Sequence, residues 1–411
     1  MGQSGATSPT VARVLRGELC SGCGLCASVA GPAIRMEQPA PGYARPAQSG
    51  GVTPEAERII AASCPGAVVA PWTGVAPEIH PYWGPWRRVL TGHATDETVR
   101  FEGSSGGAIS GLLIHALETG LIDRVVHVAA AEGDPTRNAT VVSRTAAEIV
   151  RRAGSRYTAS SPLAGLEAEL AAGGAFAVVG KPCDVSALRQ LALRDPRVGR
   201  HVKVVLSFFC GGIPSHDGVR RILKTMGVAF EDVRAFRFRG RGWPGDCVAE
   251  TDTGEGRMSY PDSWGGHLSK EVQFRCKICP DAVGGAADIA CADAWYGDDD
   301  GYPAFDEQEG RSLIVSRTEA GERLLSAALG AGRLDAEPVP VNEIDAMQPS
   351  QARRKRLVLA RTLALPLALQ PRPRMAGLKV LEAARRAPLV EALRNFVGTL
   401  RRTMLGRRSR L

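Results

Sequence analysis

Cysteines are the residues whose type and spacing most clearly indicate chemistry in this chain. Cys20, Cys23 and Cys26 form a C-x₂-C-x₂-C run, and Cys64 follows further along, directly before Pro65. Iron–sulfur proteins supply the four thiolates of a [4Fe–4S] cluster in this way, as a tight run and a remote Cys-Pro. Structural zinc also takes four cysteines, but usually as two separate CxxC pairs. The spacing therefore predicts a [4Fe–4S] cluster, with zinc or unligated thiols as the alternatives.

Two further cysteines each follow a β-like run. FAVVG (176–180) leads into Lys181-Pro-Cys183, and VKVVLSFF (202–209) leads into Cys210. Cysteines at the ends of neighbouring strands would converge in space. The two runs therefore suggest a second site that draws its ligands from separate parts of the chain.

A CxxC pair, Cys276 and Cys279, could complete that second site as a set of four thiolates. The alternative is two buried core thiols together with a separate zinc or redox CxxC. Cys291, in DIACADAW, is a rival for the fourth ligand position. Cys247 has no partner by spacing, as expected of a core thiol.

A glycine- and serine-rich turn leads directly into an apolar helical run that starts at Ala108. The turn reads Gly103-Ser104-Ser105-Gly106-Gly107. Exposed N–H groups in such a turn, with the positive end of a helix dipole, favour a bound phosphate. The turn matches neither G-x-G-x-x-G nor a Walker A loop, so it names no nucleotide. It is either a phosphate-cradling loop or, as such residues more often are, a plain helix cap.

Composition excludes several classes of protein. The 411 residues are 44% hydrophobic and 23% charged, which suits a globular chain of two or three domains rather than a collagen-like or disordered one. No apolar stretch reaches the length of about 18 residues that a membrane helix needs, and the N-terminus lacks the apolar core of a secretory signal. We therefore expect a cytoplasmic protein, in which clustered cysteines indicate metal or catalysis rather than disulfides.

The elements that must position these residues follow an α/β (α+β) pattern. From about 88 to 340, β-like runs alternate with helical patterns, which predicts an α/β domain with a partly parallel, mixed sheet. Residues 236–262 are expected to form an antiparallel insertion. The expected domains are a small metal-stabilised N-terminal segment at 1–75, the α/β domain at 76–345 and a basic amphipathic helical tail at 346–411.

The charge of the chain is concentrated in its last segment. Residues 353–411 carry 16 lysines and arginines but 2 glutamates, a net +14 that leaves −6 for the rest. Apolar residues fall at helical spacing among these arginines, at Leu389, Leu393, Phe396, Leu400 and Met404. The tail could dock on the protein's own acidic body or a partner, or attach peripherally to anionic lipid at the inner face of the membrane. Specific nucleic-acid binding is not expected, because no recognised motif accompanies the charge.

Taken in order, these motifs closely resemble the β-subunit family of coenzyme F420 hydrogenase/dehydrogenase. The matching stretches are CSGCGLC…CPG, GHATDETVRFEGSSGGAISGLLIHALETGLIDRVV, AGSRYTASSPL, VVGKPCDVSALR, SFFCGGIPS, FRFRGRGWPG and RCKICPDAVGGAADIACADAW. The resemblance covers about residues 18–335 and is specific because the motifs recur in register. It is closest to the branch found with bacterial exopolysaccharide genes.

The resemblance implies an iron–sulfur flavoprotein, with a ferredoxin-like N-terminal domain, an FAD-binding α/β domain and two [4Fe–4S] clusters. Carried over, the turn with Ser104, Ser105, Gly106 and Gly107 would hold the FAD phosphates, and Ser155 and Tyr157 would lie near the flavin. The second cluster would take Cys183, Cys210, Cys276 and Cys279. Lys181 would stabilise a reduced, anionic flavin or substrate, the alternative being a surface lysine in a turn.

The function implied is an oxidoreductase that passes electrons between a ferredoxin-like donor or coenzyme F420 and an organic acceptor. Two alternatives stay open: a (bacterio)chlorophyll(ide) ring reductase of the same family, and a non-catalytic electron-transfer or scaffold subunit that docks through its basic tail. The expected partners are ferredoxin or another redox protein, and coenzyme F420 or a small organic substrate. The tail adds a partner protein or an anionic membrane surface.

Overall fold

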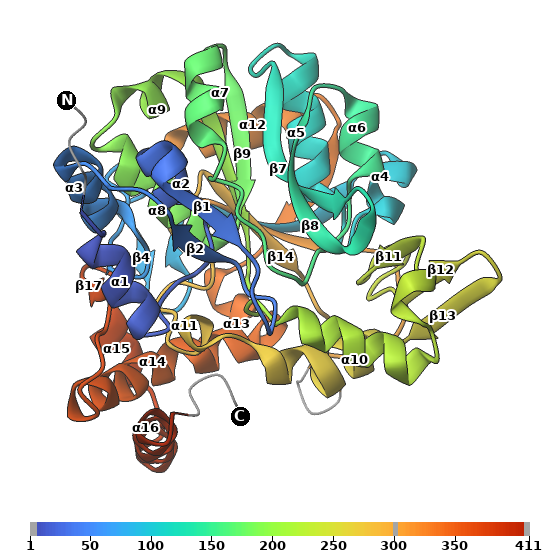
Figure 1. The fold of residues 1–411 in the computed structure, drawn as a ribbon. Coiled ribbons are helices and arrows are strands. Elements are labelled where there is room, and N and C mark those ends of the chain that lie inside the picture. The colour runs from blue at the N-terminus through green and yellow to red at the C-terminus, as the bar shows by residue number, and fades with distance from the viewer. Residues whose placement is uncertain (1–5, 299–302, 407–411) are drawn as a thin grey trace.

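The structure, a computed structural model, describes residues 6–298 and 303–406, so the ends of the predicted 1–75 and 346–411 segments (1–5 and 407–411) lie outside it. Its centre is an eight-stranded sheet with the order β16-β6-β15-β14-β10-β9-β7-β8 (Figure 1). The strands are β6 (Arg88–Ala94), β7 (Arg124–Ala131), β8 (Asp134–Ser143), β9 (Phe176–Gly180), β10 (Val202–Phe208), β14 (Ile289–Asp293), β15 (Ser312–Ser316) and β16 (Leu334–Pro338). The neighbours β14, β10, β9 and β7 pair in parallel and the outer pairs are antiparallel, so the predicted mixed sheet is confirmed.

Alternating side chains of the central strands build a core on each face of the sheet. Val125 and Val204 belong to one buried cluster, whereas their chain neighbours Val126 and Val205 belong to another. The first cluster is covered by α5 (Ala108–Glu118), α6 (Ala146–Arg151) and α12 (Glu319–Gly330). The second is covered by α7 (Leu166–Ala172), α8 (Pro182–Ala192) and α9 (Pro196–His201). The result is a three-layer α/β arrangement.

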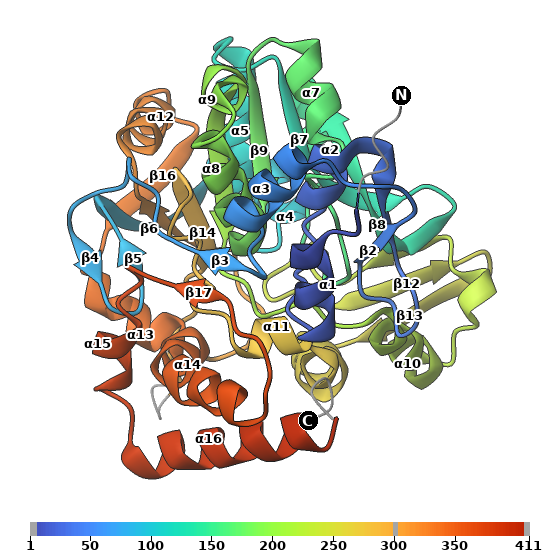
Figure 2. The ribbon, with the colours of Figure 1, turned by 60° about the vertical axis from the view of Figure 1, so that its left-hand side comes forward.

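The N-terminal segment lies against this body and shares a small sheet with the C-terminal part of the chain. It comprises α1 (Pro9–Arg16), α2 (Leu25–Ala30), η1 (Gly31–Ala33), the hairpin β1 (Ile34–Glu37) and β2 (Arg45–Gln48), α3 (Pro54–Ser63) and β3 (Val68–Val69). Helix α3 packs on α8 and α2 packs on α7. Strand β3 pairs in parallel with β17 (Arg374–Met375), as Figure 2 shows. The first cysteine run is thereby held against the end of the central sheet.

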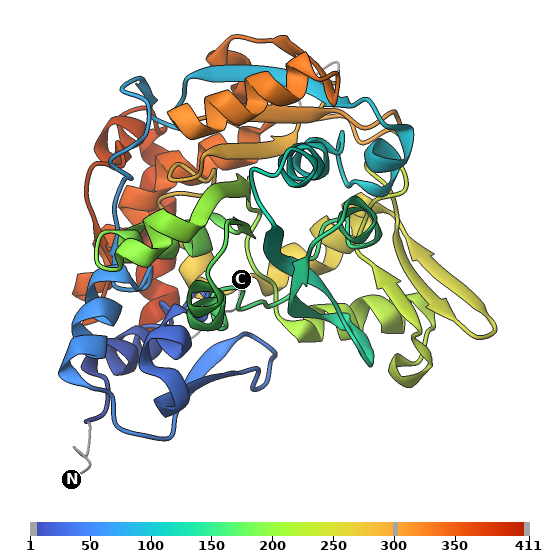
Figure 3. The same cartoon turned by 90° about the horizontal axis from the view of Figure 1, so that it is seen from above.

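The expected antiparallel insertion is present. Strands β11 (Ala235–Arg237), β12 (Cys247–Thr251) and β13 (Gly254–Met258) form an antiparallel sheet, at the right in Figure 3. Cys247 is fully buried in the small core of this sheet, in keeping with a structural thiol. The remaining elements are β4 (Ile79–His80), β5 (Gly84–Pro85), α4 (Glu97–Glu102), α10 (His216–Met226), η2 (Phe230–Asp232), η3 (Pro261–His267), η4 (Leu268–Glu271), α11 (Phe274–Lys277) and η5 (Val341–Glu343).

The C-terminal segment is helical, but much of it belongs to the body. Its helices are α13 (Ile344–Met347), α14 (Pro349–Leu367), α15 (Val380–Ala384) and α16 (Leu389–Met404). Leu357 and Leu365 of α14 are fully buried, and Ala352 packs in one cluster with Val89 and Leu313 of the sheet. Of the alternatives for the tail, α14 therefore shows docking on the chain's own body. No helix in 6–298 or 303–406 is long and apolar enough to cross a membrane.

Candidate functional site

The first cysteine group gathers at the loop before α2 and the end of α3. Besides burial, the negative charge of a Cys26 thiolate raises the pKa of Cys23, and those of Cys20 and Cys64 raise the pKa of Cys26. The four sulfur atoms are therefore close enough to interact. Burial, followed by the charge of Cys20, raises the pKa of the Cys64 thiol to about 11. The N–H of Gly22 donates to the Cys20 Sγ atom at 3.4 Å. Backbone donors to sulfur are a feature of iron–sulfur sites, so this donor set fits a [4Fe–4S] cluster.

The second cysteine group lies where β9 and β10 end. These strands pair in parallel, so the segments that carry Cys183 and Cys210 leave the sheet side by side. In addition to burial, the negative charges of Cys210 and Cys276 raise the pKa of Cys183, and that of Cys279 raises the pKa of Cys210. The four predicted ligands thus form a single neighbourhood.

Hydrogen bonds to sulfur support this second neighbourhood as well. The N–H of Ile213 donates to Cys276 Sγ at 3.4 Å, and the Gln273 amide donates to the same atom at 3.6 Å. The described ranges contain no group of three or more His, Cys, Asp or Glu side chains that could hold a metal ion. A cubane spreads four cysteines over four irons, so its ligands need not converge as those of one ion do. The chemistry of the donors suits the cluster.

Cys291 lies apart from both groups. It is buried in β14, where its register partner on β10 is Phe208, and the charge that acts on it comes from Arg317. Burial raises the pKa of this thiol to about 12. Cys210 is therefore the better candidate for the fourth ligand of the second group.

Lys181 and Asp184 form a buried ion pair between the two cysteine groups. Lys181 Nζ lies 2.8 Å from Asp184 Oδ2 and also donates to Ser160 Oγ at 3.1 Å. Burial lowers the pKa of Lys181, but the charges of Asp184 and Cys183 outweigh it and hold that pKa above its usual value. Cys23, from the other group, adds to this effect. Lys181 is 4% exposed, which contradicts the alternative of a surface lysine.

The glycine-serine turn lies between α4 and α5. Some of its polar groups form hydrogen bonds within the chain, and others face an open cavity. Ser105 Oγ donates to the Arg311 carbonyl at 2.9 Å, and the Gly106 N–H donates to Ser312 Oγ at 2.9 Å. Gly107 has a φ of +73° and caps α5 with no side-chain hydrogen bond. Because no side chain caps the first turn of α5, its N–H groups are available to a phosphate.

One cavity unites most of the predicted cofactor residues. Its lining includes Ser104, Ser105, Gly107, Ser155, Tyr157, Lys181 and Cys210, but not Gly106. The N–H of Ser155 donates to Ser104 Oγ at 2.5 Å, which ties the two predicted flavin segments to each other. The cavity thus runs from the phosphate-type turn to the second cysteine group, as an extended cofactor would require.

Two further residues line this cavity: Asp293, which the resemblance matched without giving it a role, and His127, which sequence reasoning missed. Asp293 accepts hydrogen bonds from the Arg239 guanidinium at 2.9 and 3.0 Å and from the Trp243 indole at 2.7 Å. His127, also on the wall, bonds to Ser143 at 2.7 Å. Asp293 lies in the stretch after the CxxC that matches the family, so the sequence did mark its position. No motif in the sequence marks His127 as a cavity residue.

Side chains of helix α14 form hydrogen bonds with the backbone of the second cysteine group. The sequence did not predict these contacts. The Arg354 guanidinium donates to the carbonyls of Cys210 at 2.8 Å and Gly211 at 2.5 Å. Gln351 donates to the Cys210 carbonyl, and Lys355 donates to the Pro280 carbonyl beside Cys279. In the sequence these residues are part of one long basic run, with nothing to mark them as structural.

Two family models and several known proteins match this chain. Residues 89–167 match the family model for the coenzyme F420 hydrogenase/dehydrogenase beta subunit N-terminus, and residues 174–341 match the one for its C-terminus. A coenzyme F420 hydrogenase subunit beta from Methanococcus voltae is 27% identical over 305 residues, which is 69% of this chain and 99% of that protein. A coenzyme F420-dependent sulfite reductase from Methanocaldococcus jannaschii is 27% identical over 245 residues, 55% of this chain and 35% of that protein.

A solved structure shares the fold. A chain of the F420-reducing [NiFe] hydrogenase complex from Methanosarcina barkeri matches with a TM-score of 0.56 at 21% identity, and the match covers 72% of this chain and 98% of that one. The cavity residues and the second cysteine group fall inside the two ranges that match the family. The first cysteine group and helices α14 to α16 fall outside them.

Proposed function

The chain belongs to the coenzyme F420 hydrogenase/dehydrogenase beta-subunit family, and on that premise we propose that it is an iron–sulfur flavoprotein oxidoreductase. In this proposal it passes electrons between a ferredoxin-like donor or coenzyme F420 and a small organic acceptor, using two [4Fe–4S] clusters and FAD. The names of its relatives support the electron-transfer role, since they include F420-dependent hydrogenase, sulfite reductase and formate dehydrogenase subunits.

One observation carries the proposal: both cysteine groups adjoin the same buried ion pair. Lys181 interacts with Cys23 of the first group and Cys183 of the second, and it also lines the cavity. Electron transfer between centres needs them close together in a protected interior. A chain that only stored metal would have no reason to place a buried cation at their junction.

In this proposal the cofactor is FAD, and the cavity offers residues that could hold it. The uncapped first turn of α5 would hold the phosphates, with the backbone of Ser104 and Gly107 alongside, and Ser155 and Tyr157 would border the ring system. A bound flavin would supply conversion between two-electron and one-electron transfer. The part played by Lys181 is electrostatic, because a buried ammonium group favours negative charge at the cavity wall.

The two cysteine groups would hold the clusters. Cys20, Cys23, Cys26 and Cys64 would ligate the first, and Cys183, Cys210, Cys276 and Cys279 the second. Positive charge near these groups comes from Lys181 and Arg275, both of which act on Cys20. Cationic side chains offset the negative charge of a cluster with four thiolates. The Arg275 side chain also donates to the Pro65 carbonyl, next to Cys64, and so links the two groups.

The proposal is tested with the iron-loaded full chain under anaerobic conditions. Reduced coenzyme F420 or reduced ferredoxin is offered as donor with an oxidised viologen dye as acceptor, and donor oxidation is followed by absorbance. We expect one donor to support turnover in the wild-type chain and the rate to fall at least about tenfold in Lys181→Met. If neither donor reduces the flavin or the clusters, the oxidoreductase proposal is wrong and a non-catalytic subunit takes its place.

A further inference from the structure

Helix α16 presents an apolar stripe to solvent. Leu389, Leu393, Val397 and Met404 recur on one face of the helix and are 86%, 63%, 52% and 70% exposed. At about 1.5 Å per residue the stripe runs for about 24 Å. An exposed apolar strip of this length requires an explanation, because single exposed apolar residues are ordinary but continuous patches mark interaction sites.

The helix is held to the body by its other, polar face. Thr399 and Thr403 are buried, Glu391 pairs with Arg353 of α14, and Asn395 accepts a hydrogen bond from Arg361 at 3.0 Å. Figure 2 shows α16 along the lower edge of the molecule, with α14 above it. The apolar stripe is therefore turned outward by specific polar contacts. The orientation of α16 is thus fixed by these contacts, and the exposure of the stripe follows from it.

The surface around the stripe is positively charged and includes arginine side chains without an ion-pair partner. Within the described ranges, no carboxylate pairs with the side chains of Arg372, Arg374, Arg385, Arg394 or Arg401, whereas Glu382 and Glu391 are already paired with Lys379 and Arg353. Among the described residues these five arginines therefore form no ion pair, although Glu382 lines the same cavity as Arg385. They are therefore available to bind an external anion.

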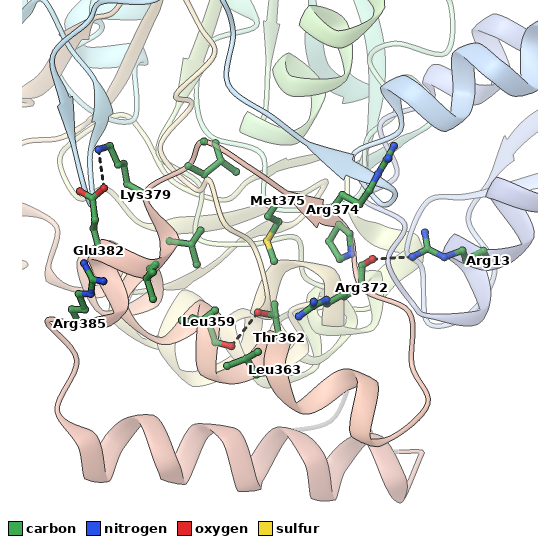
Figure 4. A pocket seen from close by; sticks show the side chains of 15 residues that line it. Arg13, Leu359, Thr362, Leu363, Arg372, Arg374, Met375, Lys379, Glu382 and Arg385 are labelled. Atoms are coloured by element: carbon green, nitrogen blue, oxygen red, sulfur yellow. Dashed lines mark hydrogen bonds and ion pairs between the residues drawn. The ribbon is translucent and has the colours of Figure 1, made fainter.

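A cavity of about 1030 Å³ lies between α14, α15, β17 and α1. Its walls combine apolar side chains such as Leu359, Leu363 and Met375 with basic ones. Figure 4 shows Arg13, Arg372 and Arg374 on one side of Met375 and Arg385 on the other, with α16 running below. A cation-rich rim over an apolar floor suits an amphiphile with an anionic head group.

We propose that this surface binds an anionic phospholipid membrane, with α16 lying in the interface and the cavity holding a phosphate head group. Amphipathic helices that carry arginines beside an apolar stripe attach in this way, and basic pockets bind lipid head groups. An acidic protein would satisfy the arginines, but the amphiphilic cavity above α16 in Figure 4 favours lipid. The surface is separate from the electron-transfer site, although α14 contacts both.

The first test is flotation of the iron-loaded full chain with vesicles at low salt. Vesicles of phosphatidylcholine with phosphatidylglycerol are compared with phosphatidylcholine alone. We expect binding to the anionic vesicles only, a loss of about tenfold or more in Leu393→Glu/Val397→Glu, and weaker binding with a shallower salt dependence in Arg372→Gln/Arg374→Gln. Leu193→Glu is the matched control, because Leu193 is 52% exposed just after α8. It should bind as the wild type does.

A second readout reports contact directly. Leu393→Trp should be quenched by brominated lipid in anionic vesicles, and Leu193→Trp should not be. If the wild type fails to bind anionic vesicles at low salt, or if Leu393→Glu/Val397→Glu binds as well as the wild type, the membrane proposal is wrong. An acidic protein would then be the occupant to seek. Because donor oxidation in solution does not depend on this surface, its result separates the two proposals.

Discussion

The Lys181 ammonium lies 2.8 Å from the Asp184 carboxylate, and the two side chains are 5% and 1% exposed. The pair closes the turn between β9 and α8, because Asp184 Oδ2 also accepts the N–H of Lys181 at 2.9 Å. Asp184 acts on both Cys23 and Cys183, so one carboxylate is felt by both cysteine groups. The predicted catalytic lysine is thus also part of the local architecture that brings the two groups together.

The first prediction concerns this pair. Lys181→Met leaves a buried, unpaired carboxylate, and we expect a loss of about 3–5 kcal/mol in the free energy of unfolding. Lys181→Met/Asp184→Asn removes both charges and should recover a large part of that loss, as measured by denaturant unfolding of the two variants. Equal destabilisation of the single and double variants would contradict a paired role.

The second prediction separates the two cysteine groups. Cys23→Ser and Cys279→Ser should each lose about four of about eight irons per chain, since each removes one ligand of a different cubane. Cys247→Ser is the control, because Cys247 is buried in the small β11–β13 core, and its iron content should match the wild type. Iron and sulfide analysis after anaerobic reconstitution provides the measurement. Unchanged iron in Cys279→Ser would remove Cys279 from the ligand set.

The third prediction concerns the turn before α5. Ser104→Ala removes the acceptor for the Ser155 N–H, which costs about 1–3 kcal/mol when a part-buried donor is left unsatisfied. Since this bond joins two walls of the cavity, flavin content should fall more than iron content does. Ser269→Ala, in η4 and outside the cavity lining, should retain its flavin. The ratio of flavin to protein measures both, and a full flavin complement in Ser104→Ala would contradict the assignment.

The fourth prediction is a pH dependence. Burial, followed by the charge of Arg152, lowers the pKa of His127 from 6.5 to about 4. The folded chain keeps this imidazole neutral while the unfolded chain takes up a proton, so stability is full above about pH 6.5 and falls as the pH drops toward 4. Between pH 7 and pH 5 the loss is about 2 kcal/mol. Denaturant unfolding of His127→Gln should show a stability that depends less on pH than that of the wild type. The same pH dependence in both proteins would exclude His127 as the cause.

The fifth prediction tests the hydrogen bonds from α14 to the second cysteine group. Arg354→Met removes two hydrogen bonds from a charged donor to the Cys210 and Gly211 carbonyls, each worth about 1.5–3 kcal/mol. We expect faster loss of iron from the second group on exposure to air, followed by absorbance and iron content. Arg385→Met, at an exposed arginine, should lose iron at the wild-type rate. Identical rates in the two variants would show that these hydrogen bonds do not protect the group.

Much of the fold could be read from the sequence, because local patterns determine it. The β-like runs that end at Gly180 and near Phe208 are adjacent parallel strands, and the insertion around Cys247 is antiparallel, as their patterns indicated. Spacing grouped Cys20, Cys23, Cys26 and Cys64, whereas the full set for the second group came from the resemblance to the family. These features depend on periodicity and on the convergence of parallel strand ends, both of which are visible in a sequence.

The rest depended on tertiary contacts that no local pattern encodes. The basic run at Arg354 looked like one face of a charged tail, yet its side chains donate to carbonyls beside Cys210 and Cys279. The turn at Ser105 and Gly106 looked like a phosphate loop, yet those two groups bond to Arg311 and Ser312. In both cases the partner lies far away in the chain, and sequence spacing does not report it.

We propose that two [4Fe–4S] clusters and a flavin surround the Lys181–Asp184 pair. The most direct test is the iron, sulfide and flavin content of anaerobically prepared full-length protein, with EPR spectra of the reduced state. We predict about eight irons and eight sulfides per chain, one FAD, and the signals of two interacting clusters. Zinc in place of iron, or protein without a flavin band, would contradict the account.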